Sequence, residues 1–214
     1  MRRPAAPFSI ALALGAAILV PGRGAQADPT AITTCQTINQ PGSYKLVGNL
    51  AITGGAGCLI VAADDVTIDL AGFSIIGQQA GAGGIQSVPY LFGHGIAVRN
   101  GSISGFVNGV ALDSATSSIV EGMRVSGTPG QQGSGIIAQG IVKGNVVSGM
   151  NIGIQAITGT IADNYVENFA DGIFAQAGST LIGNTVINNN ATGNTAGLGV
   201  TCPSNVINNT ATAT

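Results

Sequence analysis

One pattern recurs in four segments of the second half of the chain: IVKGNVV (141–147), IADNYV (161–166), LIGNTV (181–186) and CPSNVI (202–207). These segments contain Asn145, Asn164, Asn184 and Asn205, and the interval lengthens by only one position from each pair to the next. A drifting period of about 20 residues, with glycine between the units, is typical of the coils of a stacked β-solenoid. The repeat therefore predicts an all-β protein in which each unit forms one coil.

Apolar residues recur with the same period. Their alternation at every second position predicts short strands with one side facing inward. Because the same turn recurs in every unit, successive coils are expected to lie parallel, each strand pairing with its counterparts in the neighbouring coils. The inward columns expected are Ile103, Val125, Val147, Val166, Val186 and Ile207; Ile96, Val110, Ile136, Ile154, Ile173 and Leu198; and Val98, Leu112, Ala138, Ala156, Ala175 and Val200.

The recurring asparagines are expected to be structural. Asparagine tolerates left-handed backbone torsions in tight turns, and stacked amides of successive coils can bond one another as a ladder. We predict this ladder at Asn145, Asn164, Asn184 and Asn205, and a second asparagine column at Asn168, Asn188 and Asn209. Cys202 precedes Asn205 as Leu181 precedes Asn184, so it is interpreted as a buried, non-reactive core residue.

The N-terminus has the order of a secretory signal peptide. Arg2 and Arg3 precede an apolar run from Phe8 to Val20, which Ala25-Gln26-Ala27 follows, so residues 1–27 are predicted to be cleaved off. The apolar run is shorter than the roughly 20 residues that a transmembrane helix needs. We expect a secreted or periplasmic protein without a membrane span.

Charge excludes one class of partner. Removal of the leader leaves 4 Lys or Arg against 9 Asp or Glu, a formal charge of −5. Binding of phosphate backbones needs clustered basic side chains, so no nucleic-acid partner is expected. The same balance makes an anionic polysaccharide a less natural ligand, although local patches can oppose the net charge.

Two cysteines are predicted to join neighbouring coils. Cys35 and Cys58 are separated by about the length of one coil, so they can meet on adjacent rungs. A disulfide there suits an exported protein and would stabilise the N-terminal end by about 2–4 kcal/mol.

The mature chain, 28–214, is expected to be a single domain. The β-rich segment 58–77 is predicted to supply the first rungs, with Val66, Ile68 and Leu70 inward. Residues 77–94 break the pattern and are interpreted as an inserted loop, and 128–133 and 188–196 as smaller excursions. Loops on a rigid scaffold often carry binding residues.

The segments CQTINQPGSYKLVGNLAI (35–52) and CLIVAADDVTIDLAGFSIIG (58–77) resemble exported bacterial proteins of the right-handed parallel β-helix class. These proteins belong to the pectin-lyase-like superfamily, and the likeness is to its NosD-like group. The resemblance implies a right-handed parallel β-helix, here of about seven coils. It does not imply one activity, since the superfamily includes lyases, hydrolases, epimerases and binding proteins.

Catalytic patterns of the superfamily are incomplete in this chain. A calcium-dependent lyase needs several acidic ligands, for which Asp64, Asp65 and Asp69, or Asp163, Glu167 and Asp171, are the candidates. Gly93-His94-Gly95 matches a polygalacturonase tripeptide, but the acidic segments that accompany it in that family do not precede it. We therefore expect no cofactor, with calcium as the alternative, and assign no catalytic residue.

A ligand groove is the sharper hypothesis for the polar residues. Arg99 points outward and aligns with Asp113 in one register, or with Glu121 and then Lys143 in the other. Such a row is either an exposed ion-pair ladder of little consequence for stability or part of a binding surface. In the second interpretation Tyr90, His94, Arg99 and Asp113 line a shallow groove for a sugar chain.

Three functions follow as expectations. The first is an exported scaffold or carbohydrate-binding protein of the cell envelope, with a polysaccharide as partner. The second is a polysaccharide lyase or glycoside hydrolase acting on an acidic polysaccharide. The third is an adhesion or assembly element, since the segment NNTATAT (208–214) lacks a polar cap and the C-terminal end is then expected to be covered by self-association or by a partner.

Overall fold

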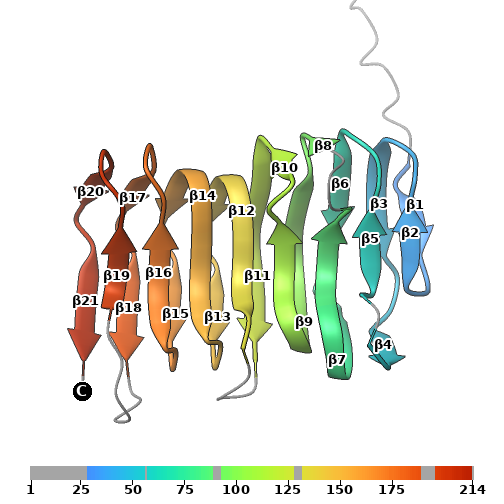
Figure 1. Ribbon diagram of the computed structural model, residues 1–214. Coiled ribbons are helices and arrows are strands. Elements are labelled where there is room, and N and C mark those ends of the chain that lie inside the picture. The colour runs from blue at the N-terminus through green and yellow to red at the C-terminus, as the bar shows by residue number, and fades with distance from the viewer. Residues whose placement is uncertain (1–27, 56, 89–92, 128–131, 189–195, 214) are drawn as a thin grey trace, which may run out of the picture.

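The computed structural model is an all-β, parallel solenoid of about seven turns, as predicted from the repeat (Figure 1). It describes residues 28–55, 57–88, 93–127, 132–188 and 196–213. The coils stack along one axis, from the N-terminal strands at one end to the C-terminal strands at the other. Within these ranges no helix is long and apolar enough to cross a membrane.

The strands form three faces, which we number in the order in which the chain visits them from β3 onward. Face 1 contains Thr30–Ile32 (β1), Gly42–Leu46 (β3), Val66–Asp69 (β6), the beginnings of Ala97–Leu112 (β9) and Ser118–Ser126 (β11), the ends of Ser134–Lys143 (β12) and Ile152–Ala162 (β14), Thr180–Ile182 (β17) and Asn205–Ile207 (β20). Face 2 contains Leu50–Thr53 (β4), the beginning of Ser74–Ser87 (β7), the middle of β9, the end of β11, Val146–Ser148 (β13), Tyr165–Glu167 (β15), Thr185–Asn188 (β18) and Thr210–Ala213 (β21).

Face 3 contains Gln36–Ile38 (β2), Leu59–Val61 (β5), the ends of β7 and β9, the beginnings of β12 and β14, Asp171–Ala175 (β16) and Ala196–Val200 (β19). A separate parallel pair, Gly93–His94 (β8) with Ala115–Thr116 (β10), lies at the corner between face 3 and face 1. Every pairing is parallel, so the chain rises by one strand spacing, about 4.8 Å, per coil.

The core is a continuous column of aliphatic side chains. Ile154 pairs with Ile136 and Ile173 on face 3, and all three are buried, as the sequence predicts. Two expected members belong elsewhere. Ile96 and Val98 were expected in the inward columns of Val110 and Leu112, which lie on face 3. Val98 instead lies on face 1, between Ile68 and Val120.

Glycines recur at the start of face 3 because the tube is narrow there. A Cβ atom at Gly153 would collide with Cγ1 of Val166 on face 2 and with the carbonyl oxygen of Gly172 in the next coil. Gly109, Gly135 and Gly172 meet the same two kinds of neighbour. These glycines, each directly before an inward aliphatic residue of face 3, therefore mark where two faces converge.

The asparagine ladder runs through the middle coils. Nδ2 of Asn145 donates to Oδ1 of Asn164 at 2.9 Å, and Nδ2 of Asn164 donates to Oδ1 of Asn184 at 2.9 Å. Each Nδ2 also donates to a main-chain carbonyl, and each Oδ1 accepts from the main-chain N–H of the preceding rung. These three amides are buried, so the ladder satisfies main-chain groups that water cannot reach.

Left-handed torsions fall one residue earlier than expected. The positive φ angles belong to Gly144 (63°), Asp163 (54°) and Gly183 (64°), each directly before a ladder asparagine. The asparagine was expected both to turn the chain at the corner between faces 1 and 2 and to supply the ladder amide, but two adjacent residues share these roles. One residue turns the chain, and the asparagine that follows supplies the amide.

The last rung of the ladder is Asn209, and the prediction of Asn205 is wrong. Nδ2 of Asn184 donates to Oδ1 of Asn209 at 2.7 Å, whereas Asn205 is exposed and pairs with Thr180 on face 1. Asn209 therefore belongs to the first asparagine column and not to the second. The coil from Asn184 to Asn209 spans 25 residues. It is therefore longer than the coil from Asn184 to Asn205 that the period predicts.

The same shift corrects the core of the last coil. Ala211, and not Ile207, lies beside Val186 on face 2. Cys202 is exposed rather than buried, because Val206 takes the position beside Leu181. Val206 is itself 51% exposed.

The predicted loop 77–94 is mostly strand. β7 continues from Ser74 to Ser87, and Ile85 pairs with Leu59 and Val110 with its side chain fully buried. The glycines of this segment resemble a loop in sequence but allow close packing, since a Cβ atom at Gly84 would collide with Ile103. Residues 89–92 lie outside the described ranges, as do 128–131 and 189–195 of the two smaller excursions.

The disulfide between Cys35 and Cys58 is present. The main-chain N–H of Gln36 donates to the carbonyl of Cys58 at 2.9 Å, so the two cysteines lie on adjacent rungs, as predicted. The bond fastens the first coil to the second.

Candidate functional site

The outer side of face 1 carries a row of alternating charges. Arg99 pairs in register with Asp69 on one side and with Glu121 on the other. Asp69 pairs with Lys45, and Glu121 pairs with Lys143. We call these five residues, Lys45, Asp69, Arg99, Glu121 and Lys143, the charged ladder; they come from β3, β6, β9, β11 and β12.

Strand alternation explains why these side chains face solvent. The residue before each of the last four is inward and buried: Ile68, Val98, Val120 and Val142. Since side chains alternate along a strand, the next residue must point outward. Parallel pairing in register then places the five charges one above another, about 4.8 Å apart.

Ion pairing within the ladder is incomplete. Nε of Arg99 lies 3.5 Å from Oδ2 of Asp69, and their side chains are 43% and 26% exposed. That Nε is buried and has no hydrogen-bond partner. Nζ of Lys143 lies 4.0 Å from Oδ2 of Asp163, the turn residue of the next coil. Within the part of the chain that the structure describes, Lys45 and Glu121 have no ion-pair partner.

A groove opens beside the N-terminal end of the charged ladder. Its volume is about 360 Å³, and its lining is polar: Asp28, Pro29, Ser43, Tyr44, Lys45, Thr67, Asp69 and Arg99. The hydroxyl of Tyr44 donates to the carbonyl of Gln40 at 2.8 Å, which fixes the ring at the rim. The groove thus brings cations, a carboxylate, hydroxyls and one aromatic ring to one place.

A second outward column runs beside the charges. It consists of Ser43, Thr67, Ala97, Ile119 and Ile141, which are partners in register. These side chains are small near the groove and aliphatic further along, and Ile141 is 43% exposed. Face 1 therefore presents two rows parallel to the solenoid axis. One row is charged, and the other carries hydroxyl groups near the groove and aliphatic side chains further along.

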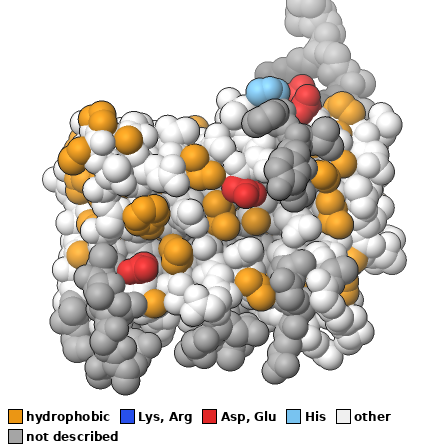
Figure 2. Space-filling view, in the orientation of Figure 1, with side chains coloured by type: hydrophobic (Ala, Val, Ile, Leu, Met, Phe, Trp, Pro, Cys, Tyr) orange, Lys and Arg blue, Asp and Glu red, His pale blue; other side chains and the backbone are white. Residues whose placement is uncertain are grey.

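His94 lies away from the ladder, at the corner formed by β8 and β10. Its Nδ1 contacts Oγ1 of Thr116, and its main-chain N–H donates to Oδ1 of Asp64 at 2.9 Å. Figure 2 shows the single histidine at the rim of the visible face, beside an acidic side chain. Its carbonyl accepts from the N–H of Asp65 at 2.8 Å, so the main chain of His94 is held in β8 between neighbouring coils.

Asp113 is not a partner of Arg99. It follows the end of β9 on face 3, and its carbonyl accepts from Nε2 of Gln139 at 2.5 Å. The second register, with Glu121 and Lys143, is the one that forms. Tyr90 lies outside the described ranges; of His94, Arg99 and Asp113, only Arg99 belongs to the site on face 1.

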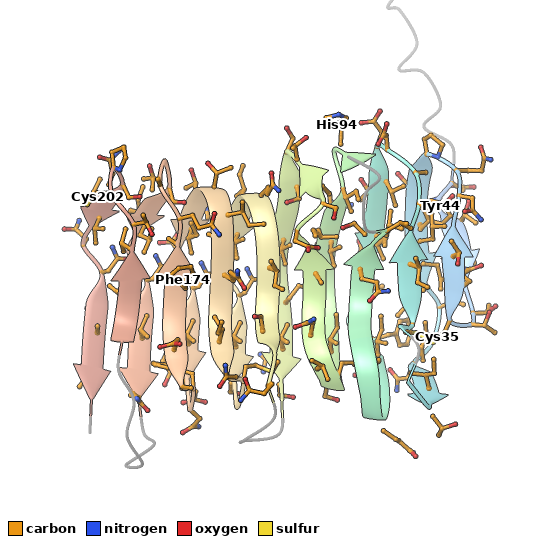
Figure 3. The ribbon with its side chains drawn as sticks, in the orientation of Figure 1. Cys35, Tyr44, His94, Phe174 and Cys202 are labelled. Carbon is orange, nitrogen blue, oxygen red and sulfur yellow. A yellow bond between two sulfur atoms is a disulfide. The ribbon has the colours of Figure 1, made fainter. Side chains whose placement is uncertain are left out.

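Lys45 was missed by sequence reasoning, and Asp69 was considered only as a calcium ligand. Figure 3 shows Tyr44, the neighbour of Lys45, near the N-terminal end of the stack and apart from His94 at the corner. The intervals from Lys45 to Asp69 and from Asp69 to Arg99 are unequal, and both are longer than the two equal intervals that follow. This irregular length conceals the register, and alternating charge was the only available signal.

The proposed acidic clusters do not form. Asp163 turns the chain between faces 1 and 2, Glu167 lies on face 2, and Asp171 begins β16 on face 3. In the described ranges no group of three His, Cys, Asp or Glu residues could hold a metal ion.

Comparison with known proteins found no matching family model, no matching curated protein and no matching solved structure. The likeness to the pectin-lyase-like superfamily therefore rests on the sequence, that is on segments 35–52 and 58–77 and on the coils that follow them to about residue 209. What the protein does has to follow from the geometry of face 1.

Proposed function

We propose that the protein is an exported β-helix scaffold that binds a carbohydrate chain along the outer side of face 1. The observation that carries the proposal is the groove lined by Lys45, Asp69 and Arg99 at one end of the straight charged ladder. Polar groups that converge in a cleft fix the orientation of a ligand and give it specificity.

The chemistry of the two columns suits a sugar polymer. Carboxylate and guanidinium groups form strong hydrogen bonds with hydroxyl and carboxylate groups of a ligand. Ala97, Ile119 and Ile141 offer an apolar row to the C–H faces of sugar rings. A ligand that extends along the axis meets both rows at once.

The rigidity of the scaffold favours affinity. The charged ladder stands on strands whose other side is buried core, so little backbone ordering accompanies binding.

Export is part of the proposal. The disulfide between Cys35 and Cys58 persists in oxidising compartments, and the predicted signal peptide at 1–27 directs a chain there. Polysaccharides of the cell envelope or its surroundings are the partners within reach. The resemblance to secreted β-helix proteins agrees with this placement.

A glycan array tests the proposal. The purified protein should retain a defined set of glycans, and Arg99→Gln should lose them while its melting temperature stays within a few degrees. Arg124→Gln is the matched control, because Arg124 is an exposed cation on face 2. Retention of no glycan, or equal loss in both variants, would contradict carbohydrate binding on face 1.

A further inference from the structure

The signs of the charged ladder alternate without exception over five consecutive coils. Cations stand at Lys45, Arg99 and Lys143, and anions at Asp69 and Glu121. Like charges are therefore separated by two rungs, about 9.5 Å at about 4.8 Å per rung. Charges of the same sign therefore repeat every two rungs along the charged ladder.

An acidic ligand can pair all of its charges with the cations of the charged ladder only if its own charges repeat with the same spacing. A polymer with a carboxylate at every rung would place some of them against Asp69 and Glu121. Like-charge contacts of this kind discriminate strongly against a wrong partner. A polymer with one carboxylate per two rungs can place each of them on a cation.

An extended disaccharide is close to two rungs in length, and a single sugar is close to one. We propose that the charged ladder selects a linear acidic polysaccharide in which uronic acid alternates with a neutral or N-acetylated sugar. This inference rests on the proposed function and specifies its ligand. Polymers made only of uronic acid are disfavoured.

The anionic rungs have a positive role in this arrangement. Asp69 and Glu121 accept hydrogen bonds, and the hydroxyl or amide N–H groups of the intervening sugar are donors. The carboxylates of the ligand meet Lys45, Arg99 and Lys143, of which Lys45 has no ion-pair partner among the described residues. Selectivity thus comes from the order of charges and not from the net charge of the protein.

The test compares three oligosaccharides of equal length by calorimetry. Hyaluronan oligosaccharides alternate glucuronic acid with N-acetylglucosamine, oligogalacturonates carry a carboxylate on every sugar, and chitin oligosaccharides carry none. We expect hyaluronan to bind at least about tenfold more tightly than the other two, a difference of about 1.4 kcal/mol. The single substitution Glu121→Gln should strengthen oligogalacturonate binding, because a repulsive charge is removed, and weaken hyaluronan binding, because a charged acceptor becomes a neutral one, so the preference between the two ligands narrows.

Two failures are distinguishable. If oligogalacturonate or chitin binds as tightly as hyaluronan, or if Glu121→Gln leaves the preference unchanged, selection by alternating charge is wrong. The proposal of carbohydrate binding is then unaffected. If none of the three binds and the glycan array is also empty, the proposed function itself fails. Glu121 is exposed and outside the core, so its substitution leaves the fold intact, and a melting curve verifies this.

Discussion

The side-chain amide of Asn184 donates a hydrogen bond of 2.7 Å to Oδ1 of Asn209, across a coil of 25 residues. The rungs before it span 19 residues, from Asn145 to Asn164, and 20 residues, from Asn164 to Asn184. Coil length therefore varies while the ladder spacing does not. Stacked amides set the register, and additional residues are accommodated between the faces.

The central ladder residue should be costly to remove. Asn164→Ala deletes the acceptor of the Asn145 N–H and the donor to the Val142 carbonyl, both in a buried region. Each buried group left unsatisfied costs about 1–3 kcal/mol, so we expect a loss of about 2–4 kcal/mol in denaturant unfolding. Asn205→Ala is the control and should change stability by less than about 0.5 kcal/mol, since Asn205 is exposed. Equal losses in the two variants would refute the register described here.

A core substitution tests the inward columns. Ile154→Ala creates a cavity in a middle coil at a fully buried position, and such changes cost about 2–5 kcal/mol. Ile141→Ala, at a half-exposed position on face 1, should cost less than about 1 kcal/mol. Chemical denaturation of both variants measures the difference, and a small loss for Ile154→Ala would mean that the column is misassigned.

Tyr165 offers a titration test on face 2. Its hydroxyl donates to Oε2 of Glu167 at 3.1 Å, and this hydrogen bond, with burial and the carboxylate charge, raises the pKa of Tyr165 above 10.0. The folded state then holds the proton more tightly than the unfolded state. The stabilisation is complete below pH 10.0 and is lost as pH rises above that value through the folded pKa.

Glu167→Ala should lower the pKa of Tyr165 towards its ordinary value. Phenolate absorbance measures this directly, because the chain has 3 Tyr and no Trp. Tyr165→Phe identifies which part of the curve belongs to this residue. Superimposable curves for the wild type and Glu167→Ala would show that the hydrogen bond has no effect in solution.

The regular coils could be predicted from the sequence, and the irregular ones could not. Asn145, Asn164 and Asn184 lie in short coils where the period alone gives the register. At the C-terminal end, NVINN (205–209) offers three asparagines, and only the stacked amides identify Asn209 as the one that continues the ladder. The periodic signal favoured Asn205, which the geometry rejects.

Part of the site could be predicted from the sequence for the same reason. Arg99, Glu121 and Lys143 are equally spaced along the chain, so their row was one of two registers considered. Lys45 and Asp69 precede them across coils of unequal length, and only the paired strands bring the five charges together. A glycine-rich strand, β7, was mistaken for a loop because glycine there serves close packing rather than a turn.

Lysine footprinting tests the central claim most directly, because Lys45 and Lys143 are the only lysines of the chain and stand at the two ends of the charged ladder. Both are exposed, so an amine-reactive reagent should modify both in the free protein. A saturating hyaluronan oligosaccharide that spans the five rungs, about 19 Å, should slow both reactions when the products are read by mass spectrometry. Unchanged modification of both lysines, or protection of one alone by a ligand of that length, would contradict a polysaccharide lying along face 1.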